Sequence, residues 1–214
     1  DPETLGSVMR GLVLSGAAIS LYGDSRPASG AEHHMSHYWE TILEQRGIRP
    51  AMHGEQVAVG TVLVLMLIEE LLKENIDFDA ARESARAYNS AAWELEIRAH
   101  YGAAADEVIA LEQKAGKNNI EGRLARIDSM QRSWDAVRVQ LETLPESSSV
   151  RALLRDIGCP CTPADIGVDD ELLMDTFRYC KEIRARYTVF QTVYDLGLTD
   201  KLAARVIEKA NSTD

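Results

Sequence analysis

Residues 57–68, VAVGTVLVLMLI, form the longest apolar run of the chain and constrain its fold most strongly. The run is shorter than the ~20 residues that cross a bilayer, and Glu69 and Glu70 end it. It is also long for a strand, and the EELLK sequence that closes it favours a helix. We therefore expect a buried core helix from about Glu55 to Lys73.

Helical periodicity continues through most of the remaining chain. Loops are expected at YGDSRPASG, 22–30, and QRGIRPAMHG, 45–54, where glycine and proline gather. The pattern predicts further helices over 3–21, from Ala31 to the second loop, over 79–102 behind a cap at Asp77 or Asp79, over 169–197, and over 198–211. Because no convincing strand pair is found, we expect an all-α fold, a single multi-helix domain over residues 1–214.

The clearest amphipathic stretch covers residues 120–144. Its apolar residues recur at steps of three and four, as one face of a helix requires. They are Ile120, Leu124, Ile127, Trp134, Val137, Leu141 and Leu144. We expect this stripe to pack in the core and not to form a binding surface.

Charge and cysteine content narrow the class of protein. The net charge of −11 repels phosphate backbones and anionic lipid, so binding to nucleic acid or to a membrane surface is not expected. Membrane insertion is not expected either, because the longest apolar run is too short. A small anionic ligand would need a local cationic pocket. The three cysteines are an odd number, and the CPC spacing is too tight for the usual metal knuckle, which favours a reducing cytoplasm. No signal peptide is visible, and the start without Met suggests a mature or trimmed segment.

Three of the five histidines crowd into GAEHHMSHYWE, residues 30–40. On a helix His33 and His37 lie one turn apart on the same face, and His34 lies to one side. His53 follows a proline-containing loop that can turn the chain back toward the first pair. Imidazole is a ligand for zinc, nickel and iron, so the spacing indicates a divalent-metal site or a metal-and-substrate site. The alternative is that these histidines have surface or packing roles.

Several stretches together resemble a known family. GDSRPASGAEHHMSHYWE (23–40), HGEQVAVGT (53–61) and the later GCPCTPADIGVDDELL and EIRARYTVFQTVYDLG resemble the sn-glycerol-1-phosphate dehydrogenases of the bacterial AraM-type branch. These belong with glycerol dehydrogenase, iron-containing alcohol dehydrogenase and dehydroquinate synthase. The resemblance runs from about residue 5 to 200, and the middle of the chain contributes helical pattern only.

The resemblance implies the C-terminal helical domain of an enzyme that reduces dihydroxyacetone phosphate to sn-glycerol-1-phosphate with NAD or NADP as cofactor. In that family a divalent metal, held by one Asp and two His, polarises the carbonyl. His33 and His53 match the two histidine ligands, His34 is the alternate ligand, and His37 matches a substrate contact. The Asp ligand and the nucleotide-binding domain are not found in this chain, so we expect weak metal binding and no dehydrogenase activity from the chain alone.

Three further residues are candidate site residues, and two of them, Arg26 and Glu55, also have a structural interpretation. Ser25 and Arg26 are candidate contacts to the substrate phosphate, and Arg26 is equally suited to a structural hydrogen bond. Glu55 would orient His53 or would be an acidic residue in the first turn of its helix. A homodimer is suggested by the family. Two other functions stay open. One is a related enzyme on the same fold, such as glycerol dehydrogenase or a lyase-type synthase, and the other is a non-catalytic helical binding or dimerisation module.

Overall fold

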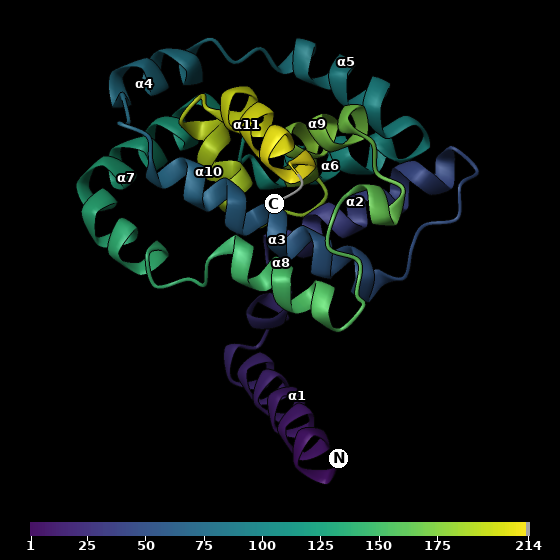
Figure 1. The fold of residues 1–214 in the computed structure, drawn as a ribbon. Coiled ribbons are helices and arrows are strands. Elements are labelled where there is room, and N and C mark those ends of the chain that lie inside the picture. The colour runs from purple at the N-terminus through teal and green to yellow at the C-terminus, as the bar shows by residue number, and fades with distance from the viewer. Residues whose placement is uncertain (213–214) are drawn as a thin grey trace.

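The computed structural model describes residues 1–212, and every regular element in this range is a helix, with no strand. The expected all-α fold is confirmed. Helices α2 to α11 pack into one body, and α1 projects away from it (Figure 1). The elements are α1 (Pro2–Tyr22), η1 (Arg26–Ala28), α2 (Ala31–Gln45), α3 (His53–Leu72), α4 (Phe78–Arg86), α5 (Ser90–Tyr101), η2 (Gly102–Ala104), α6 (Ala105–Ala115), α7 (Ile120–Leu141), α8 (Ser147–Asp156), η3 (Ala164–Ile166), α9 (Asp170–Tyr179), η4 (Cys180–Glu182), α10 (Val189–Asp195) and α11 (Thr199–Asn211).

Helix α3 is the central element, as the apolar run predicts. It packs against α2, α11 and α8 and also reaches α7 and α10. Its buried apolar side chains are Val59, Val62, Leu63, Leu65, Met66, Leu67, Ile68 and Leu71. Gly60 allows α2 to approach closely, because a Cβ there would lie 3.0 Å from the carbonyl oxygen of Glu32. This close packing positions the histidines of α2 against the start of α3.

Helix α3 begins at His53, two residues before the expected Glu55. The carboxylate of Glu55 accepts a hydrogen bond from the backbone N–H of Met52 at 3.0 Å. It thereby satisfies one of the amides that a helix start leaves free. Of the two readings of Glu55, this geometry fits the first-turn helix residue.

The expectation of one helix over 79–102 was wrong. Asp77 caps α4 as predicted, but the chain leaves the helix after Arg86 and starts again at Ser90. The Asn89 side chain accepts hydrogen bonds from the backbone amides of Ala91 and Ala92, so it caps a new helix.

The expected helix over 169–197 is also interrupted. Helix α9 ends at Tyr179, a short turn follows, and α10 begins only at Val189. Between them the Arg186 guanidinium donates to the Ser29 carbonyl and to Asp24 and Ser25 in the loop before α2. The segment is therefore held by a long-range contact that periodicity does not reveal.

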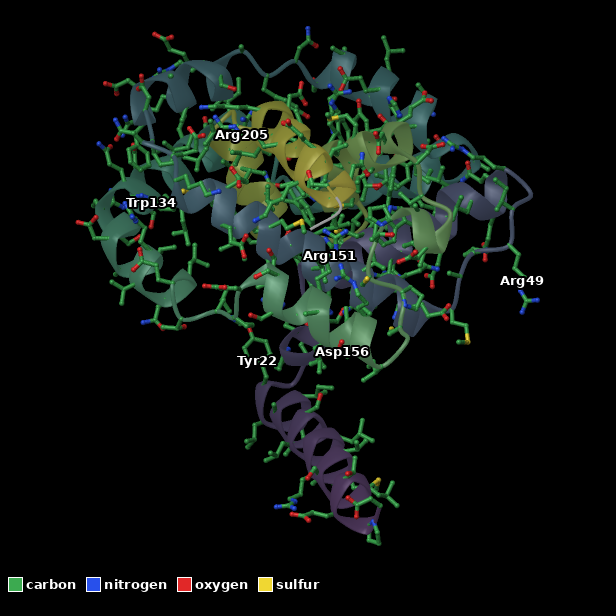
Figure 2. The ribbon with its side chains drawn as sticks, in the orientation of Figure 1. Tyr22, Arg49, Trp134, Arg151, Asp156 and Arg205 are labelled. Carbon is green, nitrogen blue, oxygen red and sulfur yellow. The ribbon has the colours of Figure 1, made fainter. Side chains whose placement is uncertain are left out.

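The amphipathic stripe of 120–144 is only partly a core stripe. Ile127 is fully buried, and Leu124 and Trp134 pack partly against the core. Ile120 and Val137 are more than one-third exposed, and Leu144 lies beyond the helix end. Trp134 lies on α7 at the edge of the body (Figure 2). The prediction that the whole stripe packs in the core was wrong, because little of the body covers the last turns of α7.

Helix α1 has no buried residue, and its main contacts are with η1. Tyr22 lies where the helix meets the body (Figure 2). Among the described residues α1 is the one helix long and apolar enough to cross a membrane. Length and composition alone are weak evidence, since signal sequences and core helices meet the same criteria. The apolar run of residues 57–68, which the sequence offers as a candidate membrane span but predicts to be a core helix, lies within the buried α3.

Candidate metal centre

Three histidine rings gather where α2 meets α3. His33 and His37 lie one turn apart on α2, and His53 is the first residue of α3. The ring centroids are 5.3 Å apart for His33 and His53, 5.4 Å for His37 and His53, and 6.4 Å for His33 and His37. The chain thus turns back across the loop at 46–52 and brings His53 to the first pair, as the spacing suggests.

Each of the three rings is held through its Nδ1 atom. Nδ1 of His33 lies 2.7 Å from Oε1 of Glu32. Nδ1 of His37 lies 3.1 Å from Oε2 of Glu40, and Nδ1 of His53 lies 3.0 Å from Oε1 of the same Glu40. An ionised carboxylate only accepts hydrogen bonds, so Nδ1 carries the proton in each neutral ring. The lone pair on Nε2 is then available to a metal ion or a substrate.

Two further polar side chains, Ser36 and Gln56, form a hydrogen-bond network behind His53. Its Nδ1 also lies 3.0 Å from Oγ of Ser36, and that hydroxyl donates to Oε1 of Gln56 at 3.2 Å. Ser36 and Gln56 are buried. The Gln56 amide in turn donates to the Ala51 carbonyl at 2.7 Å, which fixes the end of the loop that delivers His53.

Glu40 is negatively charged in this setting. Burial acts to raise its pKa, but the hydrogen bonds from His37 and His53 outweigh burial and hold the pKa below its usual value. The carboxylate therefore remains an acceptor for both rings over the ordinary pH range. Together with His37 and His53 it forms a group whose ligand atoms all lie within 4.8 Å of one another.

His34 lies apart from the three rings. Its side chain is buried, and neither ring nitrogen has a hydrogen-bond partner within residues 1–212. Burial lowers its pKa to about 4, with smaller contributions from the charges of Lys117, Arg186 and Arg184. His34 is therefore a neutral residue of the interior in this arrangement, and it shares no ring contact with the cluster.

A pocket of about 470 Å³ opens beside the cluster. His37 and Glu40 line one part of it, and Glu44, Glu107 and Arg184 line others. The Arg184 guanidinium makes no hydrogen bond or ion pair with the described residues, and the side chain is exposed. This is the one guanidinium that borders the pocket together with a histidine of the cluster.

The two residues expected to approach a substrate phosphate are engaged elsewhere. Oγ of Ser25 accepts a hydrogen bond from Arg186 at 2.9 Å. Arg26 is about half exposed and donates to the Tyr22 hydroxyl at 3.3 Å. Neither borders the pocket that contains His37. For Arg26 this geometry fits the structural reading given to it from the sequence.

Sequence reasoning missed three residues of this site. Glu40 stands three positions after His37, a spacing that puts both on one helix face, so the signal was present but unused. Glu32 directly precedes His33. Arg184 lies far along the chain, and only the break between α9 and α10 brings it to the pocket.

The structure thus combines an all-helical body with a cluster of imidazoles at the junction of two helices. Comparisons with known proteins show which proteins this chain is similar to. The chain is 26% identical over 178 residues to a glycerol-1-phosphate dehydrogenase of Halalkalibacterium halodurans, which covers 83% of the chain and 35% of that relative. It is 27% identical to the enzyme of that name from Geobacillus stearothermophilus, over 88% of the chain and 38% of the relative.

A shorter stretch is more similar. Over 67 residues, 31% of the chain, the identity to the glycerol-1-phosphate dehydrogenase of Pyrococcus furiosus is 46%, and the match covers 18% of that relative. All three relatives carry NAD(P)+ in their names. The matches confirm the resemblance to glycerol-1-phosphate dehydrogenases. The chain spans little more than a third of the length of the bacterial relatives it matches. No family model and no solved structure matches.

Proposed function

We propose that this chain is the metal- and substrate-binding helical part of a glycerol-1-phosphate dehydrogenase, which reduces dihydroxyacetone phosphate with NAD or NADP. The observation that carries the proposal is the state of the three rings. His33, His37 and His53 each have Nδ1 held by a carboxylate and Nε2 free. Metal-binding histidines are held in this way in many metalloenzymes.

The ring separations fit a shared ion. Two imidazoles bound at about 2.0–2.1 Å to one tetrahedral ion place their ring centroids roughly 5 Å apart. The separations of 5.3 Å for His33 and His53 and of 5.4 Å for His37 and His53 both satisfy this condition, and the resemblance to the family selects the first pair. We assign His33 and His53 as metal ligands and His37, which borders the pocket, as the substrate contact. Zinc, nickel and iron all accept this donor set, and a carboxylate ligand from outside the chain would complete it.

When bound, the metal would supply Lewis-acid polarisation of the substrate carbonyl. The chain's own residues orient that substrate. His37 borders the pocket, and Glu40 holds its ring through Nδ1. The hydride donor requires a nucleotide site, and the described residues contain no strand followed by a glycine loop and helix. Inactivity of the isolated chain, a cytoplasmic location and a possible homodimer stay predictions.

Arg184 is our candidate for the phosphate of the substrate, in place of Arg26 and Ser25. A guanidinium suits phosphate because it offers several donors in a planar fork. Glu44 and Glu107 also line the pocket and oppose an anion, so phosphate binding there depends on Arg184. A phosphate-recognising group favours glycerol-1-phosphate dehydrogenase over a glycerol dehydrogenase on the same fold.

Calorimetric titration with Zn²⁺ and Ni²⁺ tests the metal assignment. His33→Ala and His53→Ala should each weaken binding at least tenfold, about 1.4 kcal/mol. His100→Ala is the matched control, because His100 is paired with Asp175 on α9, away from the cluster. Binding that is indifferent to both cluster substitutions would contradict the assignment.

Phosphorus NMR of sn-glycerol-1-phosphate with the zinc-loaded chain tests the phosphate contact. Arg184→Gln should weaken binding about tenfold or more, since a charged hydrogen bond is lost. Arg26→Gln should leave binding unchanged. The reverse ranking of the two variants would return the assignment to Arg26.

A further inference from the structure

Glu40 is the one carboxylate of the described chain that joins two histidines from different helices. Its Oε2 accepts from His37 on its own helix, and its Oε1 accepts from His53 at the start of α3. Glu32 contacts only His33 among the histidines. A single side chain thus fixes two rings of the candidate metal centre relative to each other.

The direction of these bonds has a chemical consequence. A histidine ring without partners prefers the proton on Nε2, which would block that nitrogen as a ligand. An acceptor placed at Nδ1 reverses the preference and leaves the Nε2 lone pair free. Glu40 does this for both rings, and Ser36 adds a second acceptor for His53.

Geometry separates this role from direct coordination. The Glu40 oxygens lie 3.0–3.1 Å from Nδ1 of each ring, and Nδ1 and Nε2 point away from each other on an imidazole. A Glu40 oxygen therefore cannot bind the same ion that Nε2 binds while it keeps the hydrogen bond. In the competing arrangement, Glu40 and the Nδ1 atoms of His37 and His53 bind the ion directly. The ion would then replace the protons on both Nδ1 atoms.

We propose that Glu40 is a positioning residue that sets the Nδ1–H tautomer of both His37 and His53, so that their Nε2 atoms face the metal and the substrate. The role given to these tautomers, metal and substrate binding, rests on the proposed function. The prediction that both rings carry the proton on Nδ1 in the metal-free chain does not depend on the proposed function. Helix α2 is well suited to carry this group, because Trp39 and Ser36 beside it are fully buried and hold its backbone in place.

The first test uses the metal-free chain with ¹⁵N-labelled histidine, at a pH where the rings are neutral. Long-range ¹H–¹⁵N correlation spectra distinguish the two tautomers. We expect Nδ1–H for His37 and His53 in the wild type and a shift of His37 toward Nε2–H in Glu40→Ala. Glu44→Ala is the matched control, because it removes an equal charge from the same helix and pocket without touching a histidine. Unchanged tautomers in Glu40→Ala would overturn the proposal.

The second test adds metal. Glu40→Ala should weaken Zn²⁺ binding about 10- to 100-fold, as loss of a histidine-orienting carboxylate does elsewhere. Glu40→Gln replaces one of the two accepting oxygens by an NH2 group, which only donates, so in this geometry it accepts from one ring only. It should fall between the wild type and Glu40→Ala, and it also guards against a folding defect. In the ¹¹³Cd-loaded chain, coupling should appear at Nε2. Coupling at Nδ1 of His37 or His53 would mean direct coordination beside Glu40 and would overturn the positioning role. Absence of any metal binding, with the tautomers as expected, would contradict the proposed function alone.

Discussion

Helices α1 and α3 are both long and apolar, yet the structure uses them in opposite ways. In α3 the side chains of Leu63 and Leu67 are at most 1% exposed. In α1 Leu12 and Leu14 are 63% and 70% exposed, and no residue of the helix is buried. Apolar content therefore does not identify the core by itself. Contacts with other helices identify the core, and the candidate site lies at the closely packed contact between α2 and α3.

The difference has a visible cause in the neighbours of each helix. Gly60 lets α3 contact the backbone of α2, and Trp39 of α2 donates its indole N–H to Thr176 on α9 at 2.8 Å. Helix α1 makes its main contacts with the short η1 instead. Substitutions in the two regions should therefore differ in their effect on stability, and the following predictions are ordered by the size of that effect.

Trp39→Ala should lower the free energy of unfolding by about 3–5 kcal/mol, because it opens a large cavity and removes the hydrogen bond from the indole to the buried Thr176 hydroxyl. Trp39 is fully buried, whereas Trp134 is only partly covered. Trp134→Ala should cost clearly less and serves as the matched control. Urea unfolding followed by circular dichroism measures both. Equal losses would mean that α2 is not the packed element described above.

Glu182 should make the body sensitive to acid. It is fully buried, and although burial acts to raise its pKa, the charges of Lys181 and Lys117 lower the pKa to about 2. The folded state then favours the carboxylate more than the unfolded chain does. This stabilisation is fully present above about pH 4.5 and is lost as pH falls toward 2.

The pH dependence of urea unfolding between pH 6 and 2 measures the effect. Glu182→Gln should remove this part of the dependence and destabilise the protein at pH 7, since the mostly buried Lys117, 3.1 Å from Glu182 in the wild type, loses its negatively charged partner. Glu107→Gln, at an exposed carboxyl, is the control. A wild-type profile that matches the Glu182→Gln profile would show that the pair does not act as described.

Leu12→Ala in α1 should change the free energy of unfolding by less than about 0.5 kcal/mol, because an exposed leucine gains little from folding. Leu63→Ala in α3 is the matched substitution and should cost about 2–5 kcal/mol. The pair compares the two helices directly. If Leu12→Ala proved as costly as Leu63→Ala, α1 would be packed in solution against a surface that the fold does not show.

Much of this arrangement follows from sequence patterns, and the exceptions have physical reasons. The central helix and the approach of His53 to His33 and His37 follow from an apolar run and from helical spacing. The break before Asn89 was missed because a local side-chain cap competes with strong helical propensity on both sides.

The role of Glu40 was missed for a different reason. Its second partner, His53, lies on another helix, and no local pattern encodes that contact. The exposure of Val137 on α7 likewise depends on which elements reach that helix, which periodicity does not specify. Local rules thus predict elements and faces, and long-range packing decides which faces are covered and which polar groups meet.

Anomalous diffraction at the zinc edge, from crystals of the chain grown with Zn²⁺, tests the central claim most directly. The account predicts a zinc peak bonded to Nε2 of His33 and His53, with Nδ1 of His53 still hydrogen-bonded to Glu40 and Nε2 of His37 facing the pocket. A peak elsewhere on the molecule, or zinc bound among the Nδ1 atoms and the Glu40 carboxylate, would contradict it.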